Sequence, residues 1–249
     1  MRAHPVLFAL ALSATLSSSR AAARSKHKSD HRQRHRAIAS VSPPEPAPPA
    51  APLAASAAFQ KGTSAPQILQ SSYEKEAAGH YSEALTALDA LPAEERGTYL
   101  PTLRRAWLLH LDGRETESWA AYAKARDLEQ DSVEARLGAM LPAMALRRWP
   151  EVQSLAKTVL AVEPGNYFAS LRLAFAAYNL GRLAEAEALY RKLLARYPSD
   201  AEVRAGLGWC LFKQGKRAEA RREFLQALAS APRSKSIADG LRLVAQAER

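Results

Sequence analysis

Residues 201–234 read AEVRAGLGWCLFKQGKRAEARREFLQALASAPRS, and landmarks of this stretch recur along the chain at an interval of 34 residues. Three prolines are separated by this interval, and four glycines by the same interval or twice it: Pro164, Pro198 and Pro232; Gly79, Gly113, Gly181 and Gly215. The spacing stays in phase, without an insertion, from about Ala65 to Pro232. Self-similarity at a fixed period of about 20–50 residues indicates a repeat protein.

The apolar pattern within each unit predicts two helices joined by a tight turn. In the last unit Ala220, Phe224 and Ala227 follow the glycine at i, i+4 and i+7, which is one face of a helix. The run 207–212, upstream of the glycine, has helical periodicity of its own. The glycine between the two helices fits a turn.

The last unit resembles the tetratricopeptide repeat, whose signature combines Trp, Leu-Gly, Tyr, Ala, Phe and Pro within 34 residues. The matching residues are Leu207, Gly208, Leu211, Ala220, Phe224, Ala227 and Pro232, and in the unit before it Leu173, Ala174, Ala186, Tyr190 and Pro198. The resemblance implies an all-α helical solenoid with five repeats in residues 65–232. Stacked repeats need polar caps, and residues 233–249 predict a C-terminal capping helix with Ile237, Leu241, Val244 and Ala245 on one side.

Two departures from the signature predict local irregularity. The Trp position holds Ile68, Thr102, Arg136, Ser170 and Arg204. In the third unit Arg147 replaces the turn glycine and Pro142 lies inside the first helix. Because proline lacks an N–H group and its ring clashes with the preceding turn, we expect this helix to be kinked or shortened.

Residues 1–23 have the features of a secretory signal peptide. Basic Arg2 precedes an apolar run from Val6 to Leu16, which is too short to span a bilayer. Small residues at Ala21 and Ala23 predict cleavage after Ala23, and Ser17 and Ser19 offer an alternative site after Ser19. We therefore expect a periplasmic or secreted protein, with an organelle transit peptide as the alternative, since no acid occurs among the first 29 residues.

Residues 24–40 form a basic arm and residues 41–64 a linker rich in proline and alanine; neither is apolar enough to fold alone. Within residues 24–36, six basic side chains against Asp30 leave a charge of +5. This arm predicts binding to an anionic surface or polymer through Lys26, Lys28, Arg32, Arg34 and Arg36. Nucleic acid is not expected as its ligand if the protein is exported. The spacing of His27, His31 and His35 leaves weak metal binding as an alternative.

Charge divides the repeat region into two parts. Residues 65–132 carry 7 basic and 12 acidic side chains, and residues 133–249 carry 19 and 11. A bipolar solenoid is suited to a dipolar partner or to head-to-tail stacking. The alternative is that helix surfaces fluctuate in charge without functional meaning.

Signals for catalysis are scarce. Outside the arm, histidine occurs only at His80 and His110, apart from His4 in the leader, and neither belongs to a nucleophile or phosphate-binding motif. Cys210, the single cysteine, lies in an apolar helix and is interpreted as a core residue. We expect no enzyme activity, no cofactor and no metal site.

An apolar stripe on the first helices is the candidate binding site. Its three columns, in order of repeat, are Leu69, Leu103, Leu137, Leu171 and Ala205; Tyr73, Trp107, Leu141, Phe175 and Trp209; Glu76, His110, Met144, Tyr178 and Phe212. The predicted partner-binding residues are Leu103, Trp107, Leu171, Phe175, Tyr178, Trp209 and Phe212, facing a concave groove that accepts an apolar or aromatic-bearing segment of a protein. The alternative is that these side chains are core.

These observations predict an exported adaptor that mediates protein–protein interaction in a cell-envelope assembly. The alternative function is binding to a polyanion or membrane surface through the basic arm, with the repeats as a scaffold.

Overall fold

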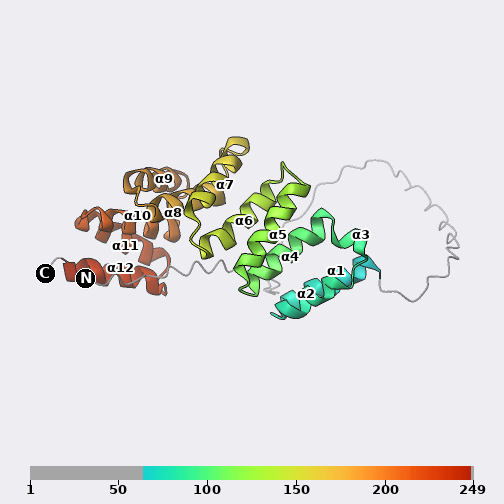
Figure 1. Ribbon diagram of the computed structural model, residues 1–249. Helices are drawn as coiled ribbons and strands as arrows, with labels where there is room; N and C mark the ends of the chain where they lie inside the picture. The colour runs from blue at the N-terminus through green and yellow to red at the C-terminus, as the bar shows by residue number, and fades with distance from the viewer. Residues whose placement is uncertain (1–63, 248–249) are drawn as a thin grey trace, which may run out of the picture. The chain divides into compact units, whose positions relative to one another are not determined.

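The computed structural model describes residues 64–247, which contain twelve α-helices and no strand (Figure 1). The first helices of the five pairs are α1 (Ala65–Ala77), α4 (Tyr99–Leu111), α6 (Val133–Ala145), α8 (Tyr167–Asn179) and α10 (Ala201–Lys213). The second helices are α2 (Tyr81–Asp89), α5 (Glu115–Leu128), α7 (Trp149–Val162), α9 (Leu183–Arg196) and α11 (Arg217–Ser230). A short α3 (Ala93–Arg96) follows the first pair, and α12 (Lys235–Ala247) follows the last. The predicted signal peptide, the basic arm and the predicted linker up to residue 63 lie outside the described residues.

A residue of an N-capping type precedes every first helix and also α12. The residues immediately before α1, α4, α6, α8, α10 and α12 are Ser64, Thr98, Ser132, Asn166, Asp200 and Ser234. All belong to the types that accept hydrogen bonds from the free N–H groups of a helix start. Asn166, for example, accepts from the Ala169 N–H at 2.9 Å, and Asp200 accepts from the Val203 N–H at 3.0 Å.

The turns between paired helices share one backbone conformation. Gly79, Gly113, Gly181 and Gly215 adopt φ angles from +76° to +80°, in the left-handed region that glycine enters without steric cost. The N–H group of the next residue bonds back to the end of the first helix, as from Arg114 to the Leu109 carbonyl at 2.8 Å. This bond closes the first helix and orients the second.

The first helix of the third repeat keeps the length of its equivalents, so the prediction of a shortened helix was wrong. Helix α6 has 13 residues, as α4 and α8 have, and its hydrogen bonding continues past the proline, where the Leu146 N–H bonds the Pro142 carbonyl at 2.9 Å. Pro142 lies in the last turn, where its missing N–H removes a single helix bond. Arg147 adopts the turn conformation of the glycines, with φ +57°.

The irregular repeat is the first. Helix α2 has 9 residues, whereas α5, α7, α9 and α11 have 14. Pro92 stands where the longer helices continue, and its ring would clash with the carbonyl of Leu88. The chain therefore leaves the helix at Asp89 and forms α3 before the second pair begins.

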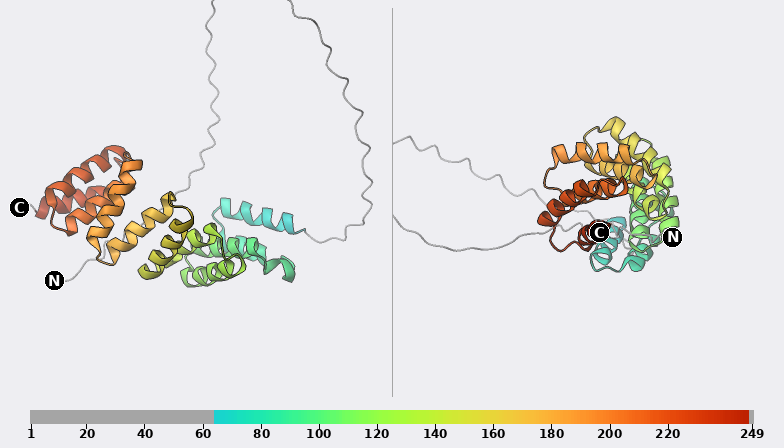
Figure 2. Two further views of the ribbon diagram at one scale, coloured as in Figure 1. Left: turned by 90° about the horizontal axis from the view of Figure 1, so that it is seen from above. Right: turned by 90° about the vertical axis from the view of Figure 1, so that its left-hand side faces the viewer.

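Successive helices pack in chain order to form a stack, which Figure 2 shows from two further sides. Contacts between alternate helices join α4 to α6, α6 to α8, α8 to α10 and α10 to α12, and all of these are first helices or their equivalent. Second helices of neighbouring repeats approach one another less closely. The first helices therefore form the inner layer of the stack, and the second helices form the outer layer.

A ladder of side-chain contacts joins the second helices α5, α7 and α9 to the turn of the next repeat. The Arg148 guanidinium lies over the Trp119 ring at 5.3 Å from its centroid. One repeat later Arg182 donates to Gln153 at 2.9 Å, and in the next repeat the Lys216 ammonium donates to the Glu187 carboxylate at 2.9 Å. The ladder fixes the register of neighbouring repeats.

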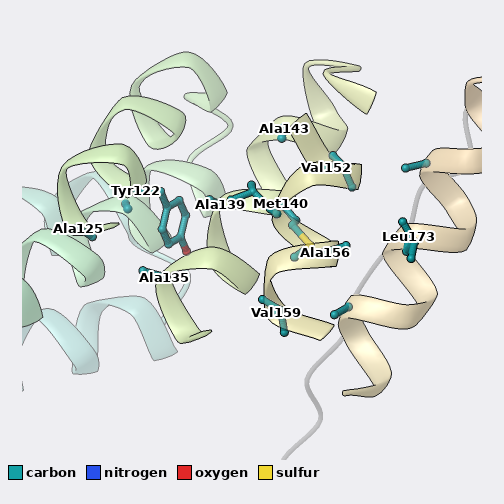
Figure 3. Close-up of a cluster of buried hydrophobic side chains, with 14 of the residues drawn as sticks. Tyr122, Ala125, Ala135, Ala139, Met140, Ala143, Val152, Ala156, Val159 and Leu173 are labelled. Atoms are coloured by element: carbon teal, nitrogen blue, oxygen red, sulfur yellow. The ribbon is translucent and has the colours of Figure 1, made fainter. Parts of the chain in front are cut away.

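A core cluster of buried hydrophobic side chains lies across α4 to α8 (Figure 3). Tyr122 of α5 is 2% exposed and packs against Gly138 of α6, where an added Cβ atom would lie 2.3 Å from its ring. Gly206 and Tyr190 repeat the arrangement two units later, with 2.5 Å. Glycine at these positions permits the close approach of the two helices.

Helix α12 closes the last described repeat. Its Ile237 and Val244 are buried and Leu241 is half-buried, as predicted for a capping helix, while Ala245 is exposed. Within residues 64–247 no helix combines the length and apolar character needed to cross a membrane.

Candidate functional site

The predicted binding residues all lie on the inner layer, and we call their three columns the first-helix stripe. Leu103, Leu171 and Trp209 are only 8%, 6% and 6% exposed. The remaining predicted residues are half-buried: Trp107, Phe175, Tyr178 and Phe212. The stripe is therefore neither wholly core nor wholly surface, and its character changes along the stack.

At its N-terminal end the stripe is organised by a buried arginine. The Arg104 side chain donates to the Glu76 carboxylate at 2.8 Å and to the Ser72 hydroxyl at 3.0 Å. The Trp107 indole N–H donates to the second Glu76 oxygen at 2.7 Å. Tyr73, which is 48% exposed, lies over the Arg104 guanidinium at 3.4 Å from the ring centroid. These contacts hold both aromatic rings in fixed orientations at the surface.

At its C-terminal end the stripe merges with the core. The Trp209 ring meets the Phe224 ring of α11 edge-on at 5.1 Å and the Phe212 ring at 6.2 Å. Phe175 meets Trp149 edge-on at 5.4 Å. The Lys213 ammonium lies over the Tyr178 ring at 4.0 Å from the centroid and supplies a cation at the rim.

A fourth column of this face was not predicted. Leu100 and Phe168, each the second residue of its helix, lie three residues before Leu103 and Leu171 and are 50% and 43% exposed. Residues three apart share a helix face, so these side chains extend the stripe toward solvent. The same helix position holds Glu134 and Glu202 in the third and fifth repeats, so the column alternates in character. Because of that alternation the fourth column was not identified from the sequence, although the i, i+3 spacing of Leu100 and Phe168 from the stripe residues could have indicated it.

Polar groups buried near the stripe are held by the fold. The Arg172 guanidinium donates to the Leu137 carbonyl at 2.6 Å, and burial lowers its pKa to about 10, so it stays charged at neutral pH. Burial raises the pKa of the Tyr178 phenol to about 12 and keeps it neutral. Such groups fix local geometry and do not exchange protons near pH 7.

The described residues offer little for catalysis. Cys210 is buried, and burial raises the pKa of its thiol to about 12, so the reactive thiolate does not form at neutral pH. His110 is bound to the Glu115 carboxylate at 2.8 Å. Across residues 64–247 no group of three or more histidine, cysteine or acidic side chains is placed to hold a metal ion. The predicted polyanion-binding residues Lys26, Lys28, Arg32, Arg34 and Arg36, and the three histidines between them, lie outside the described residues.

Comparison with known proteins agrees with the repeat assignment. Tetratricopeptide-repeat family profiles match residues 143–201 and residues 181–246. A search of curated proteins found no match to the chain.

Solved structures share the fold at low sequence identity. MamA from Desulfovibrio magneticus RS-1 superposes with a TM-score of 0.62 at 15% identity, covering 68% of this chain and 95% of that protein. TTC0263, a thermophilic TPR protein of Thermus thermophilus, gives 0.57 at 19% identity, with 73% and 98% covered. The Cut9–Hcn1 structure of the APC/C gives 0.61 at 15% identity, with 72% and 36% covered. Together with the 34-residue helix pairs, these findings show that residues 143–246 contain tetratricopeptide repeats and that the described helices have the tetratricopeptide-repeat fold.

Proposed function

We propose that this protein is a non-enzymatic scaffold that binds a protein partner along its first-helix stripe. The observation that carries the proposal is the set of exposed apolar side chains Tyr73, Leu100 and Phe168 on one face of the inner layer. Stacked helical repeats present extended binding surfaces of this kind. Rigid aromatic side chains on such a surface supply contact area at a low cost in conformational entropy.

The stripe favours a partner segment with apolar or aromatic side chains. Trp107 and Tyr73 are held by Glu76 and Arg104, so they need little reordering when a partner binds. Phe175 and Phe212 extend the same face through the fourth and fifth repeats. An amphipathic helix or an extended peptide matches an apolar stripe that crosses several helices.

A charge-introducing pair of substitutions tests the stripe. Leu100→Glu with Phe168→Glu places two carboxylates on it, and because both side chains are exposed the fold is expected to persist. The matched control, Leu128→Glu with Val162→Glu, makes the same change at exposed apolar residues that end α5 and α7. Partner proteins captured from native cells should be lost with the first pair and kept with the second. Equal capture by both pairs would contradict binding through the stripe.

We further propose that the chain is exported and acts in a cell-envelope assembly, on the strength of the signal-like residues 1–23. The mature protein should then begin near Arg20 or Arg24. N-terminal sequencing of the protein from native cells checks this, and recovery of Met1 would contradict a cleaved signal peptide.

The second candidate function rests on the charge of +5 in residues 24–36. An arm that binds an anionic polymer or membrane releases counterions, so its affinity should fall steeply with salt. Deleting residues 24–36 should abolish binding to anionic vesicles while capture of the stripe partner persists. Vesicle binding that is insensitive to salt, or that survives the deletion, would leave the arm as a linker only.

A further inference from the structure

The outer face of α11 carries a cluster of three exposed arginines. The side chains of Arg217, Arg221 and Arg222 form no hydrogen bond or ion pair within residues 64–247. Leu225, which is 50% exposed, follows them on the same face. The helix also contains two acids, but both are engaged elsewhere: Arg191 pairs with Glu219 at 3.4 Å, and Arg204 with Glu223 at 3.0 Å.

The neighbouring repeats show how such a face is covered. On α9, Glu187 receives Lys216 from the turn that precedes α11, and Arg191 pairs with Glu219 at the start of α11. Both contacts join opposite charges: the first links α9 to the turn before α11, and the second links α9 to α11 itself. Arg221 stands 34 residues after Glu187 and so occupies its place in the ladder. Within residues 64–247 no second helix follows α12 to supply the next partner.

We propose that the outer face of α11 docks an acidic α-helix of a partner protein, in the place that a following second helix would take. Glu187 is acidic, whereas Arg221, at the equivalent position one repeat later, is basic. The group that complements Arg221 is therefore a carboxylate. Guanidinium groups bind carboxylates through two parallel hydrogen bonds, which gives the contact geometric specificity. Leu225 provides an apolar anchor beside the charged pairs. This surface is separate from the first-helix stripe, because α11 belongs to the outer layer.

An acidic helix fits this face better than a lipid surface does. Anionic lipids attract any cluster of arginines. The arginines here lie at i, i+4 and i+5 along one helix. On α9, the position equivalent to Arg221 is contacted by Lys216 of the turn before α11, and the position equivalent to Leu225 is contacted by Glu219 of α11 itself. The spacing therefore matches a helix with carboxylates one turn apart.

The test uses the full chain and a labelled alanine-based helical peptide of about 18 residues, a length that supports helix formation in water. One version carries glutamates one turn apart and the other carries lysines at the same places. Arg221→Glu with Arg222→Glu reverses two charges on α11. The matched control, Lys124→Glu with Lys157→Glu, makes the same change in net charge at exposed lysines on α5 and α7. Melting temperatures show whether both variants fold. If the charge-reversed α11 variant does not fold, Arg221→Gln with Arg222→Gln replaces it.

Affinity for the glutamate peptide should fall by about tenfold in the α11 variant and by no more than about twofold in the control, because only the former breaks direct ion pairs. The α11 variant should also gain affinity for the lysine peptide, a change to which the basic arm cannot contribute. Equal losses in both variants would overturn the proposal, since only net charge would then matter. The proposal would also be overturned if anionic vesicles bound through Arg221 and Arg222 and the glutamate peptide did not bind. It would likewise be overturned if the chain associated with itself and the α11 variant abolished that association.

Discussion

The two ends of the first-helix stripe use the same sequence column for opposite purposes. Tyr73 and Trp209 occupy equivalent positions of the first and fifth repeats, yet one is 48% exposed and the other 6%. Tyr73 lies on a charged pair, Arg104 with Glu76, whereas Trp209 lies on the Phe224 ring. A position in a repeat therefore fixes the direction of a side chain, and its neighbours decide whether it is core or surface.

The neighbours explain the difference. In the fifth repeat Gly208 lets Phe224 approach α10 so closely that an added Cβ atom would lie 2.8 Å from its ring. In the first repeat the corresponding residues are Ser72 and Leu88, and the Ser72 hydroxyl donates to the Ala84 carbonyl at 3.0 Å. The Phe224 ring gives Trp209 an aromatic surface to pack against, whereas the first repeat has a buried, hydrogen-bonded serine and a leucine at the two positions.

The largest expected effect is on Trp209. Trp209→Ala should lower the free energy of unfolding by about 3–5 kcal/mol, the range for removing a buried aromatic side chain. Tyr73→Ala should cost about 1 kcal/mol or less, since it removes a half-exposed ring and one cation–π contact. Denaturant unfolding of the two variants measures both values. Equal losses would mean that the column has one character throughout.

The next largest effect concerns the arginine beneath Tyr73. Arg104→Leu leaves the partly buried Glu76 carboxylate without its cation and should cost about 3 kcal/mol, as breaking a buried ion pair does. Its neighbour gives the control, because Arg105 pairs with Asp89 at the surface and Arg105→Leu should cost about 1 kcal/mol or less. Thermal and denaturant unfolding compare the two. A similar small loss for both would show that the Arg104 pair does not organise this end.

A smaller effect, dependent on pH, belongs to the C-terminal end. Hydrogen bonds from Lys216, and also from Gln214 and Arg191, lower the pKa of Glu187 from 4.5 to about 2. A carboxyl with a lowered folded-state pKa stabilises the fold above its unfolded pKa, and this contribution is lost as the pH falls toward the folded value. Stability should therefore fall from about pH 4.5 to about pH 2, and Glu187→Gln should flatten that slope and cost about 1 kcal/mol at pH 7. An unchanged slope would contradict this role for Glu187.

The smallest effect is at the turn of the third repeat. Arg147 adopts a left-handed conformation that costs a non-glycine residue about 1 kcal/mol or more. Arg147→Gly should raise the melting temperature slightly, with a gain below about 1 kcal/mol, because glycine loses more entropy on folding. Gly113→Ala, at the equivalent turn, should lower it by a similar amount. Destabilisation by Arg147→Gly would indicate that the arginine side chain contributes to the fold.

Much of the fold was predictable because a strict period multiplies weak signals. The turn glycines and the apolar columns gave the helix pairs, and the capping column from Ser64 to Asp200 would have fixed the helix starts as well. The effects of two prolines were not anticipated. Pro142 is tolerated because it lies in a last turn, whereas Pro92 ends α2 early because it would fall inside a helix.

The stripe itself was predictable, but its division into core and surface was not. That division depends on contacts between residues far apart in the sequence, such as Arg104 with Glu76 and Trp209 with Phe224. Periodicity identifies which residues share a face and carries no information on what lies opposite. The exposed Leu100 and Phe168 escaped notice for a different reason, since glutamates interrupt their column.

Site-specific crosslinking in native cells tests the central claim most directly. A photoreactive phenylalanine at Tyr73 or Phe168 would report on the stripe, and the same residue at Leu128 or Val162 on exposed helix ends elsewhere. The scaffold function predicts one partner protein crosslinked from both stripe positions and from neither control position. Crosslinks to that partner from the control positions alone, or from none of the four, would contradict binding through the first-helix stripe.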